Sequence, residues 1–190
     1  AIPFKTGPLF LFAGDGPARD DIEREIKELN IGDRVRVLGY RNDIPELLSR
    51  CSIFVLPSLF EGHPLSIMEA MAAGKPVIAS DIRGVDEIIV NGVSGYLVHP
   101  RNPEALASAI RTLLEDKELS GRIAEAGRRR IENEFSADTM TNKVTGIYED
   151  LIAQGMNFPA YSCSDTFPMI CRPLSGRTAQ VRRSQCNAPQ

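Results

Sequence analysis

The sequence lacks the features that mark membrane, secreted or nucleic-acid-binding proteins. None of its apolar runs is long enough to cross a bilayer, and residues 1–5 do not resemble a signal peptide. Its 4 cysteines do not suggest a disulfide framework. A net charge of −3 provides no basic face for nucleic acid. We therefore expect a cytoplasmic protein with no transmembrane segment and no nucleic-acid partner.

The composition is that of one globular domain. Of the 190 residues, 43% are hydrophobic and 25% are charged, which suffices for a core. Short apolar runs alternate with segments whose apolar residues recur at helical spacing. The runs cover residues 9–12, 35–38, 53–56, 77–79 and 96–98. Strands that alternate with helices predict an α/β, Rossmann-like doubly wound parallel sheet with helices on both faces.

Residues 58–81 contain the most informative stretch. The loop Glu61-Gly62-His63-Pro64 follows a predicted strand, and Ser66 opens a predicted helix that Gly74 closes. A helix N-terminus carries unpaired N–H groups and about half a positive charge, so it can bind an anion such as phosphate. In open α/β sheets, ligands bind at the carboxyl ends of strands, where this loop is expected.

Two carboxylates frame this loop, Glu61 within it and Glu69 one turn into the helix. Ser66 and Glu69 also have the spacing of a capping box, in which each side chain bonds a backbone N–H of the same helix end. The spacing alone leaves both interpretations of Glu69 open, a structural cap or a ligand contact.

The run Glu-Gly-x-Pro-Leu-Ser-x-x-Glu-Ala-Met-Ala-x-Gly-x-Pro-Val resembles the signature of the group 1, or family 4, glycosyltransferases. The resemblance extends over residues 8–154 and includes Gly-Asp-Gly-Pro at residues 14–17. It implies an enzyme of the GT-B fold that transfers a sugar from a nucleotide-diphosphate sugar with retention of configuration. It also implies that no metal is required, and the sequence has no Asp-x-Asp.

The resemblance assigns residues 1–154 to the donor-binding domain, incomplete at its N-terminus. The family's Gly-Arg-Leu…Lys-Gly element, which clamps the diphosphate, and its acceptor-binding domain are expected upstream of Ala1. The fragment alone is therefore expected to be inactive, and any peripheral membrane contact would come through the missing domain. The tail 155–190 holds 3 of the 4 cysteines without zinc-ligand spacing and is expected to be poorly ordered.

The site residues follow from the same resemblance. It places Glu61, the catalytic candidate, near the sugar hydroxyls, and Glu69 on the ribose. The other expected donor-binding residues are Gly14, Gly16, Tyr40, Arg41, Gly62, His63, Pro64, Leu65 and Ser66. Tyr40 and Arg41 are candidates for the base pocket, with an ordinary surface loop as the alternative. His63 is expected to contribute its backbone, if it is more than an exposed loop residue.

Other features have simpler interpretations. The pair Gly14-x-Gly16 lacks the third glycine of a dinucleotide-binding turn, which argues against NAD. Pro17 is predicted at the first position of a helix that stops near Asn30. Cys51 is predicted to be a small core residue. The run 128–130, three arginines among glutamates, predicts a solvated, salt-bridged face.

Three functions are consistent with these patterns. The first is the donor-binding part of a glycosyltransferase. The second is a GT-B-like epimerase acting on a nucleotide sugar, against which the Glu-Gly-x-Pro-Leu-Ser run argues. The third is a non-catalytic module that binds a nucleotide sugar.

Overall fold

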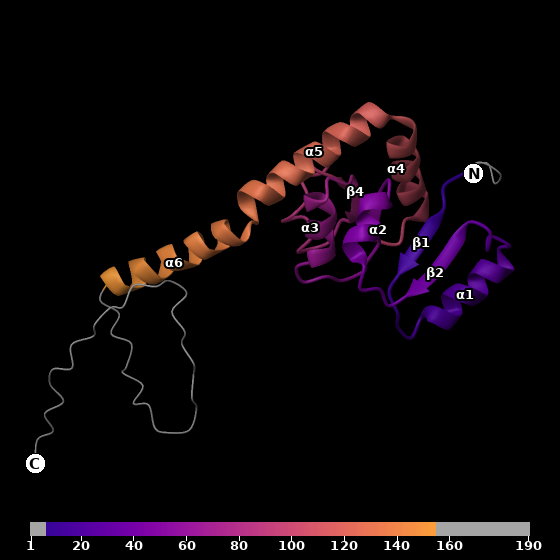
Figure 1. Cartoon of the computed structure of the whole chain (residues 1–190), viewed down its shortest axis with the longest axis horizontal. Helices are drawn as coiled ribbons and strands as arrows, with labels where there is room; N and C mark the ends of the chain where they lie inside the picture. Colours follow the sequence, from indigo (N-terminus) through magenta and orange to yellow (C-terminus); the bar gives the residue numbers. More distant parts are fainter. Residues whose placement is uncertain (1–6, 155–190) are drawn as a thin grey trace, which may run out of the picture. The chain divides into compact units, whose positions relative to one another are not determined.

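A computed structural model describes residues 7–154 (Figure 1). By its internal contacts the chain divides into two units between Tyr148 and Glu149. In chain order the elements are β1 (Phe10–Ala13), α1 (Arg19–Glu28), β2 (Val35–Gly39), α2 (Ile44–Arg50), β3 (Phe54–Leu56), α3 (Leu65–Ala72), β4 (Val77–Ser80), β5 (Tyr96–Val98), α4 (Pro103–Glu115), α5 (Lys117–Glu134) and α6 (Ala137–Ala153). None of the helices over this range is long and apolar enough to span a membrane. The predicted tail 155–190 lies outside the described residues.

All strand pairing within the described elements is parallel. β1 pairs with β2, and β3, β4 and β5 form a second sheet with β4 in its centre. Each β3-to-β4 and β4-to-β5 pair is in continuous register, from Phe54 opposite Val77 to Ser80 opposite Val98. The alternation of strands and helices therefore produces the parallel α/β arrangement that the sequence predicts.

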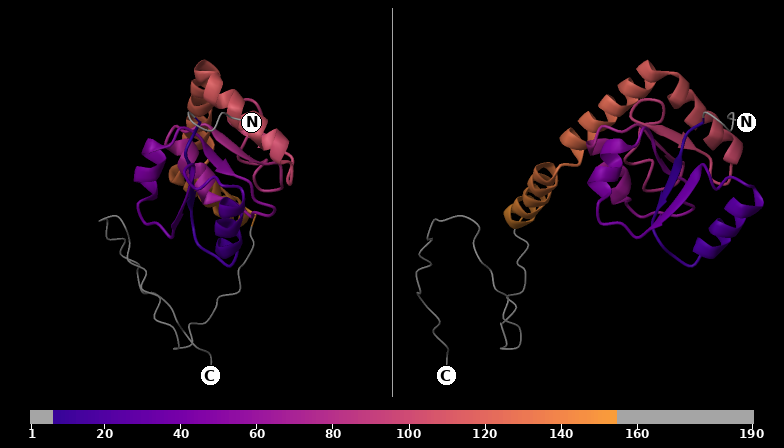
Figure 2. Two further views of the ribbon diagram at one scale, coloured as in Figure 1. Left: turned by 90° about the vertical axis from the view of Figure 1, so that its right-hand side faces the viewer. Right: turned by 45° about the vertical axis from the view of Figure 1, so that its right-hand side comes forward.

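β4 is buried on both faces because helices cover both sides of its sheet. Val77 and Ala79 face a core that includes α3, whereas Ile78 faces a second core with Leu113 of α4 and Ile123 of α5. All four β4 residues are buried, as expected for a central parallel strand. Figure 2 shows the same arrangement from two further sides. The prediction of helices on both faces is confirmed.

The end of α3 follows the predicted rule for helix termination. Gly74 has φ +66°, and its N–H bonds the carbonyl of Met71 at 2.9 Å. The N–H of Lys75 bonds the carbonyl of Ala70 at 3.0 Å. These two bonds form a Schellman motif, which needs a left-handed residue that glycine supplies without strain.

Helix starts agree less well with the prediction. α1 begins at Arg19, so placing Pro17 at its first position was wrong. The carboxylate of Asp15 accepts the N–H of Gly16 at 2.8 Å, and the N–H of Arg19 bonds the carbonyl of Gly16 at 3.1 Å. Residues 16–18 therefore form a turn before the helix. Asn30 follows the last turn of α1 with φ 52°, as a helix stop should.

The arginine run of α5 forms a salt-bridged face, as predicted. Arg128, Arg129 and Arg130 pair with glutamates one turn away at 2.8 to 2.9 Å. Arg130 also donates to the carbonyls of Ile88 at 2.8 Å and Glu87 at 2.9 Å. Exposed Arg–Glu pairs within one helix contribute little to stability. The bonds from Arg130 to the carbonyls of Glu87 and Ile88, in contrast, connect α5 to a distant loop.

Candidate functional site

The loop between β3 and α3 lies at the carboxyl end of β3, where the sequence places the candidate site. Pro64 is the N-cap of α3, with extended backbone at φ −71° and ψ 103°. The N–H of Ile67 bonds the carbonyl of Pro64 at 3.2 Å. Within residues 7–154, the backbone N–H groups of Leu65 and Ser66 have no hydrogen-bond acceptor. The first turn of α3 thus presents two donors to an incoming anion.

The capping-box interpretation of Ser66 and Glu69 is wrong. A capping box needs its serine at the N-cap and its glutamate at the third helical position. Ser66 is instead the second residue of α3, and no side chain caps the helix. Glu69 is exposed and forms no ion pair or side-chain hydrogen bond among the described residues. Its carboxylate is therefore not used to hold the helix start.

Glu61 has a different environment from Glu69. Its side chain is half-buried, and its Oε1 accepts a hydrogen bond from the hydroxyl of Ser58 at 2.7 Å. Ser58 lies in the same loop, directly after Pro57 at the end of β3. The hydroxyl restricts the rotamer of the carboxylate while one oxygen keeps free lone pairs for a ligand.

The segment that follows β4 contacts the loop between β3 and α3. Gly84 has φ +89°, and a Cβ atom built on it would lie 2.1 Å from the carbonyl oxygen of Gly62. No L side chain fits there, because the neighbouring atoms belong to backbone. Residues 83–88 form a series of turns. This tight contact fixes the distance between the loop and these turns.

His63 lies beside the end of α5. Its ring centroid is 6.0 Å from that of Phe135 at an interplanar angle of 36°. The guanidinium of Arg130 is 5.5 Å from the centroid of the Phe135 ring, a cation–π distance. His63 is exposed, as the simpler interpretation expected, but its ring has a defined neighbour. His63 and Phe135 are 72 positions apart, so no spacing pattern in the sequence could predict this contact.

The remaining candidates lie at the carboxyl end of the two-stranded sheet. The N–H of Gly14 bonds the carbonyl of Gly39 at 2.8 Å, and both glycines have positive φ. This bond brings the loop containing Gly16 to the loop that begins with Tyr40. Tyr40 is 83% exposed and so has its ring free to stack on a ligand.

Arg41 is engaged with a neighbour within its own loop. Its Nε donates to the carboxylate of Asp43 at 2.7 Å, and its second guanidinium nitrogen bonds the same carboxylate. The side-chain hydrogen bond raises the pKa of Arg41 and lowers the pKa of Asp43. The role of Arg41 in base binding stays a prediction, and its guanidinium is engaged with Asp43.

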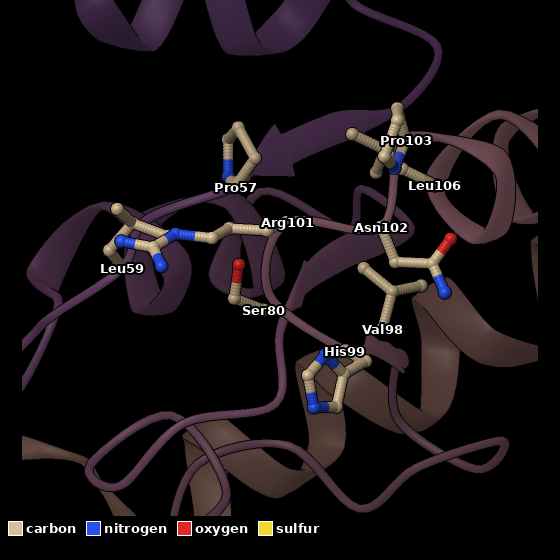
Figure 3. Close-up of a pocket in the computed structure, with 9 residues that line it drawn as sticks. All are labelled: Pro57, Leu59, Ser80, Val98, His99, Arg101, Asn102, Pro103 and Leu106. Atoms are coloured by element: carbon tan, nitrogen blue, oxygen red, sulfur yellow. The ribbon is translucent and has the colours of Figure 1, made fainter.

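A cavity of about 300 Å³ lies on the α4 side of the three-stranded sheet (Figure 3). It is lined by Pro57, Leu59, Ser80, Val98, His99, Arg101, Asn102, Pro103 and Leu106. None of the predicted donor-binding residues lines it. Figure 3 shows apolar side chains around most of its wall, with the guanidinium of Arg101 extending towards Leu59. The cavity borders the candidate site, because Pro57 and Leu59 belong to the loop between β3 and α3.

No group of three or more His, Cys, Asp or Glu residues is placed to hold a metal ion between residues 7 and 154. Cys51 donates from its Sγ to the carbonyl of Leu48 at 3.3 Å and packs, half-buried, against the core that includes α3. The predicted core residue therefore lies at the edge of that core. Burial raises the pKa of the Cys51 thiol. The other three cysteines lie outside the described residues.

Residues 5–130 match the family described as glycosyl transferases group 1, and the chain belongs to this family. It is 35% identical over 144 residues to the alpha-D-kanosaminyltransferase of Streptomyces kanamyceticus, covering 75% of this chain and 37% of that relative. It is 33% identical over 145 residues to an Escherichia coli alpha-1,3-galactosyltransferase, which acts on a GlcNAc-diphosphoundecaprenol, covering 76% and 37%. The chain thus spans a little over a third of these curated relatives.

Solved structures give the same result for the fold. HepE of Anabaena in complex with UDP superimposes with a TM-score of 0.74 at 29% identity, over 79% of this chain and 42% of that chain. The UDP-glucose complex of HepE gives 0.70 at 30% identity, over 75% and 41%. These neighbours are GT-B glycosyltransferases, so the Rossmann-like fold class is confirmed.

Proposed function

We propose that this chain is the donor-binding part of a glycosyltransferase that transfers a sugar from a nucleotide-diphosphate sugar to an acceptor with retention. The observation that carries the proposal is the start of α3, where two N–H groups that have no acceptor among residues 7–154 lie between Glu61 and Glu69. Membership of the group 1 family and the UDP and UDP-glucose complexes of HepE support the same ligand class.

The chemistry requires stabilisation of charge. The bond between the anomeric carbon and a diphosphate oxygen breaks, and the electron pair leaves with the diphosphate. The sugar becomes oxocarbenium-like, and the acceptor oxygen then forms a bond to the anomeric carbon as its proton is released. Donors preorganised towards the developing anion lower this barrier. Leu65 and Ser66 would supply such donors through their backbone N–H groups.

Each remaining candidate has a proposed role. The carboxylate of Glu69 binds the ribose hydroxyls, and that of Glu61, oriented by Ser58, binds hydroxyls of the transferred sugar. Gly62, His63 and Pro64 shape the loop through their backbone. Gly14 and Gly16 allow the chain to approach the donor closely, and Tyr40 and Arg41 border the base.

We assign no covalent nucleophile and no metal to this reaction. The diphosphate charge would be balanced by the start of α3 together with cationic groups from the polypeptide that precedes this chain in the intact enzyme. The acceptor-binding domain would come from the same source, since the chain spans a little over a third of its relatives. The chain alone is then inactive. A cytoplasmic location, peripheral to the membrane at most, remains a prediction.

The limited span also favours a second candidate, a module that binds a nucleotide sugar without catalysis. An epimerase stays an alternative within the same fold. Transfer assays with radiolabelled nucleotide sugars and mixed acceptors separate the three functions. We expect no transfer by the 190-residue chain, and transfer with a retained anomeric configuration by the protein encoded by the complete gene. Turnover by the fragment, or epimerised donor as the only product of the complete protein, would refute the proposal.

A further inference from the structure

Two adjacent residues of the loop between β3 and α3 are held by contacts from outside that loop. A Cβ built on Gly84 would lie 2.1 Å from the carbonyl oxygen of Gly62, so the two backbones touch. The ring centroid of His63 lies 6.0 Å from that of Phe135, the C-cap residue of α5. Both contacts come directly before the start of α3. The turns after β4 and the end of α5 therefore support the same short stretch of the loop.

Arg130 of α5 connects these two supports. Its guanidinium lies 5.5 Å from the centroid of the Phe135 ring. Its Nε donates to the carbonyl of Ile88 at 2.8 Å, its Nη2 to the carbonyl of Glu87 at 2.9 Å, and its Nη1 to the carboxylate of Glu134 at 2.8 Å. The side chain is only 22% exposed. Three charge-assisted hydrogen bonds and the ring therefore hold the planar guanidinium in one orientation.

The turns that Arg130 contacts also carry the glycine that touches the loop. The N–H of Gly84 bonds the carboxylate of Asp86 at 3.0 Å, and the N–H of Ile88 bonds the carbonyl of Val85 at 3.0 Å. Val85 and Ile88 are both buried in the core. A segment that is bonded within itself and closely packed transmits a displacement from one end to the other. Holding the Ile88 end thus also holds the Gly84 end.

α5 is well placed to act as a rigid support, because it packs against α3 (Figure 1). The two helices come close at Gly127, where an added Cβ would lie 3.4 Å from Cε of Met71 and 2.9 Å from the carbonyl oxygen of Ser94. Ile131 of α5 is buried in the same core as Met71. The helix that carries Arg130 is therefore in direct contact with the helix whose start forms the candidate site.

We propose that Arg130 and Phe135 are positioning residues for this site. Phe135 holds His63, and Arg130 holds both Phe135 and the turns on which Gly62 rests. Pro64, whose ring fixes φ, links His63 to α3, so a displacement of His63 moves the first N–H groups of the helix. Preorganised donors act fully only when they are held to within about 0.5 Å. The role of both residues rests on the proposed function, in which the donor diphosphate binds at the start of α3.

A purely structural role is the alternative to be separated. Phe135 packs against the core that includes α3, and such a contact stabilises a fold without affecting any ligand. The two roles differ in their dependence on His63. A contribution of Phe135 to the core is independent of the His63 ring. A positioning role passes through that ring and disappears when the ring is removed.

A double-mutant cycle on nucleotide affinity makes this separation. Phe135→Leu should weaken UDP binding about threefold to tenfold and leave uridine binding unchanged. Phe135→Tyr keeps an aromatic ring and should retain the affinity for UDP. In a chain that already carries His63→Ala, Phe135→Leu should cost less than about a further twofold. An equal loss in both backgrounds, or equal losses for UDP and uridine, would overturn the positioning role.

Amide chemical shifts of the ligand-free chain test the support of the loop without any nucleotide. Arg130→Lys keeps the charge but cannot bond both carbonyls in a planar fork, so the resonances of Gly62 and His63 should shift by more than a linewidth. Arg129→Lys is the matched control, because the Nε of Arg129 bonds Glu125 within α5. The amide of Ile78, buried in β4, should stay unshifted in both variants if the fold is intact.

The two experiments distinguish failure of this proposal from failure of the proposed function. If the unmodified chain bound no UDP, the proposed function would be refuted, and the ligand-free resonances would still decide whether α5 holds the loop. If the unmodified chain bound UDP while Arg130→Lys and Phe135→Leu left Gly62 and His63 unshifted, the positioning roles would be refuted and the proposed function would stand.

Discussion

A Cβ atom on Gly84 would lie 2.1 Å from the carbonyl oxygen of Gly62, so the two backbones are in direct contact. The relationship joins residues 22 positions apart, one in the candidate site and one in the turns that follow β4. Since Gly84 also has φ +89°, both its conformation and its surroundings exclude a side chain. The position of the loop between β3 and α3 thus depends on a residue that does not belong to it.

Gly84→Ala should weaken ligand binding through this contact. The left-handed conformation alone costs about 1 to 2 kcal/mol, and the clash with backbone adds about 1 to 3 kcal/mol. Urea unfolding should show a loss of stability equal to the sum of these two costs, and UDP titration should show weaker binding. Gly92→Ala is the matched control, because Gly92 has φ +74° and open space around its Cβ position. If both variants lose the same stability and bind UDP alike, the contact does not position the loop.

Glu69→Gln separates a ligand role from a structural role. The exposed carboxylate does not cap α3, so the substitution should leave the melting temperature nearly unchanged. Hydrogen bonds from ribose hydroxyls to a charged group contribute about 1.5 to 3 kcal/mol, which corresponds to an affinity loss of about tenfold to a hundredfold for UDP. Binding of the 2′,3′-dideoxy analogue should change much less. Equal losses for the two nucleotides would remove Glu69 from the ribose site.

Leu65→Pro tests the backbone donors of α3. Leu65 is the first helical residue and follows an extended Pro64, which is the position where proline fits best. The substitution removes one N–H and little packing, since Leu65 is 66% exposed. We expect UDP to bind about tenfold more weakly, with uridine unaffected. Leu65→Ala keeps the N–H and serves as the control. Equal UDP affinity of the two variants would place the diphosphate elsewhere.

Cys51 should react slowly with alkylating reagents because burial raises its thiol pKa. The unfolded thiol ionises near pH 8.5, about its ordinary value. The folded form stays protonated above that pH, so its contribution to stability is constant below the unfolded pKa. It declines as the pH rises from there through the folded pKa. Alkylation at pH 8.5, followed by peptide mass spectrometry, should label Cys51 far more slowly than in urea. Equal rates would show an accessible, unshifted thiol.

The order of elements could be predicted from the sequence because it follows from local patterns. Apolar runs of three or four residues predicted β2, β4 and β5 to within a residue, since buried parallel strands need apolar side chains on both faces. Gly74 and Asn30 marked helix ends because few residues adopt positive φ. The separation of the strands into two sheets could not be predicted from the sequence, since strand pairing depends on residues that are distant in the chain.

The details of the site were harder to predict because side-chain competition decides them. Pro64, with its fixed φ, takes the N-cap position, so Ser66 lies two positions beyond the N-cap and cannot form the capping box. Asp15 binds the N–H of Gly16 and delays α1 by two residues. Asp43 engages Arg41, and Phe135 meets His63, through contacts that no spacing rule contains.

The central claim is that a nucleotide diphosphate binds at the start of α3. Titration of the isotope-labelled chain with UDP, GDP and ADP, followed by amide chemical shifts, tests it most directly because weak binding is still visible residue by residue. We predict saturable shifts for at least one nucleotide, largest at Leu65 and Ser66, extending to Glu69, and reduced in Leu65→Pro. Saturable shifts confined to the cavity lined by Pro57 and Arg101, or none with any of the three nucleotides, would contradict it.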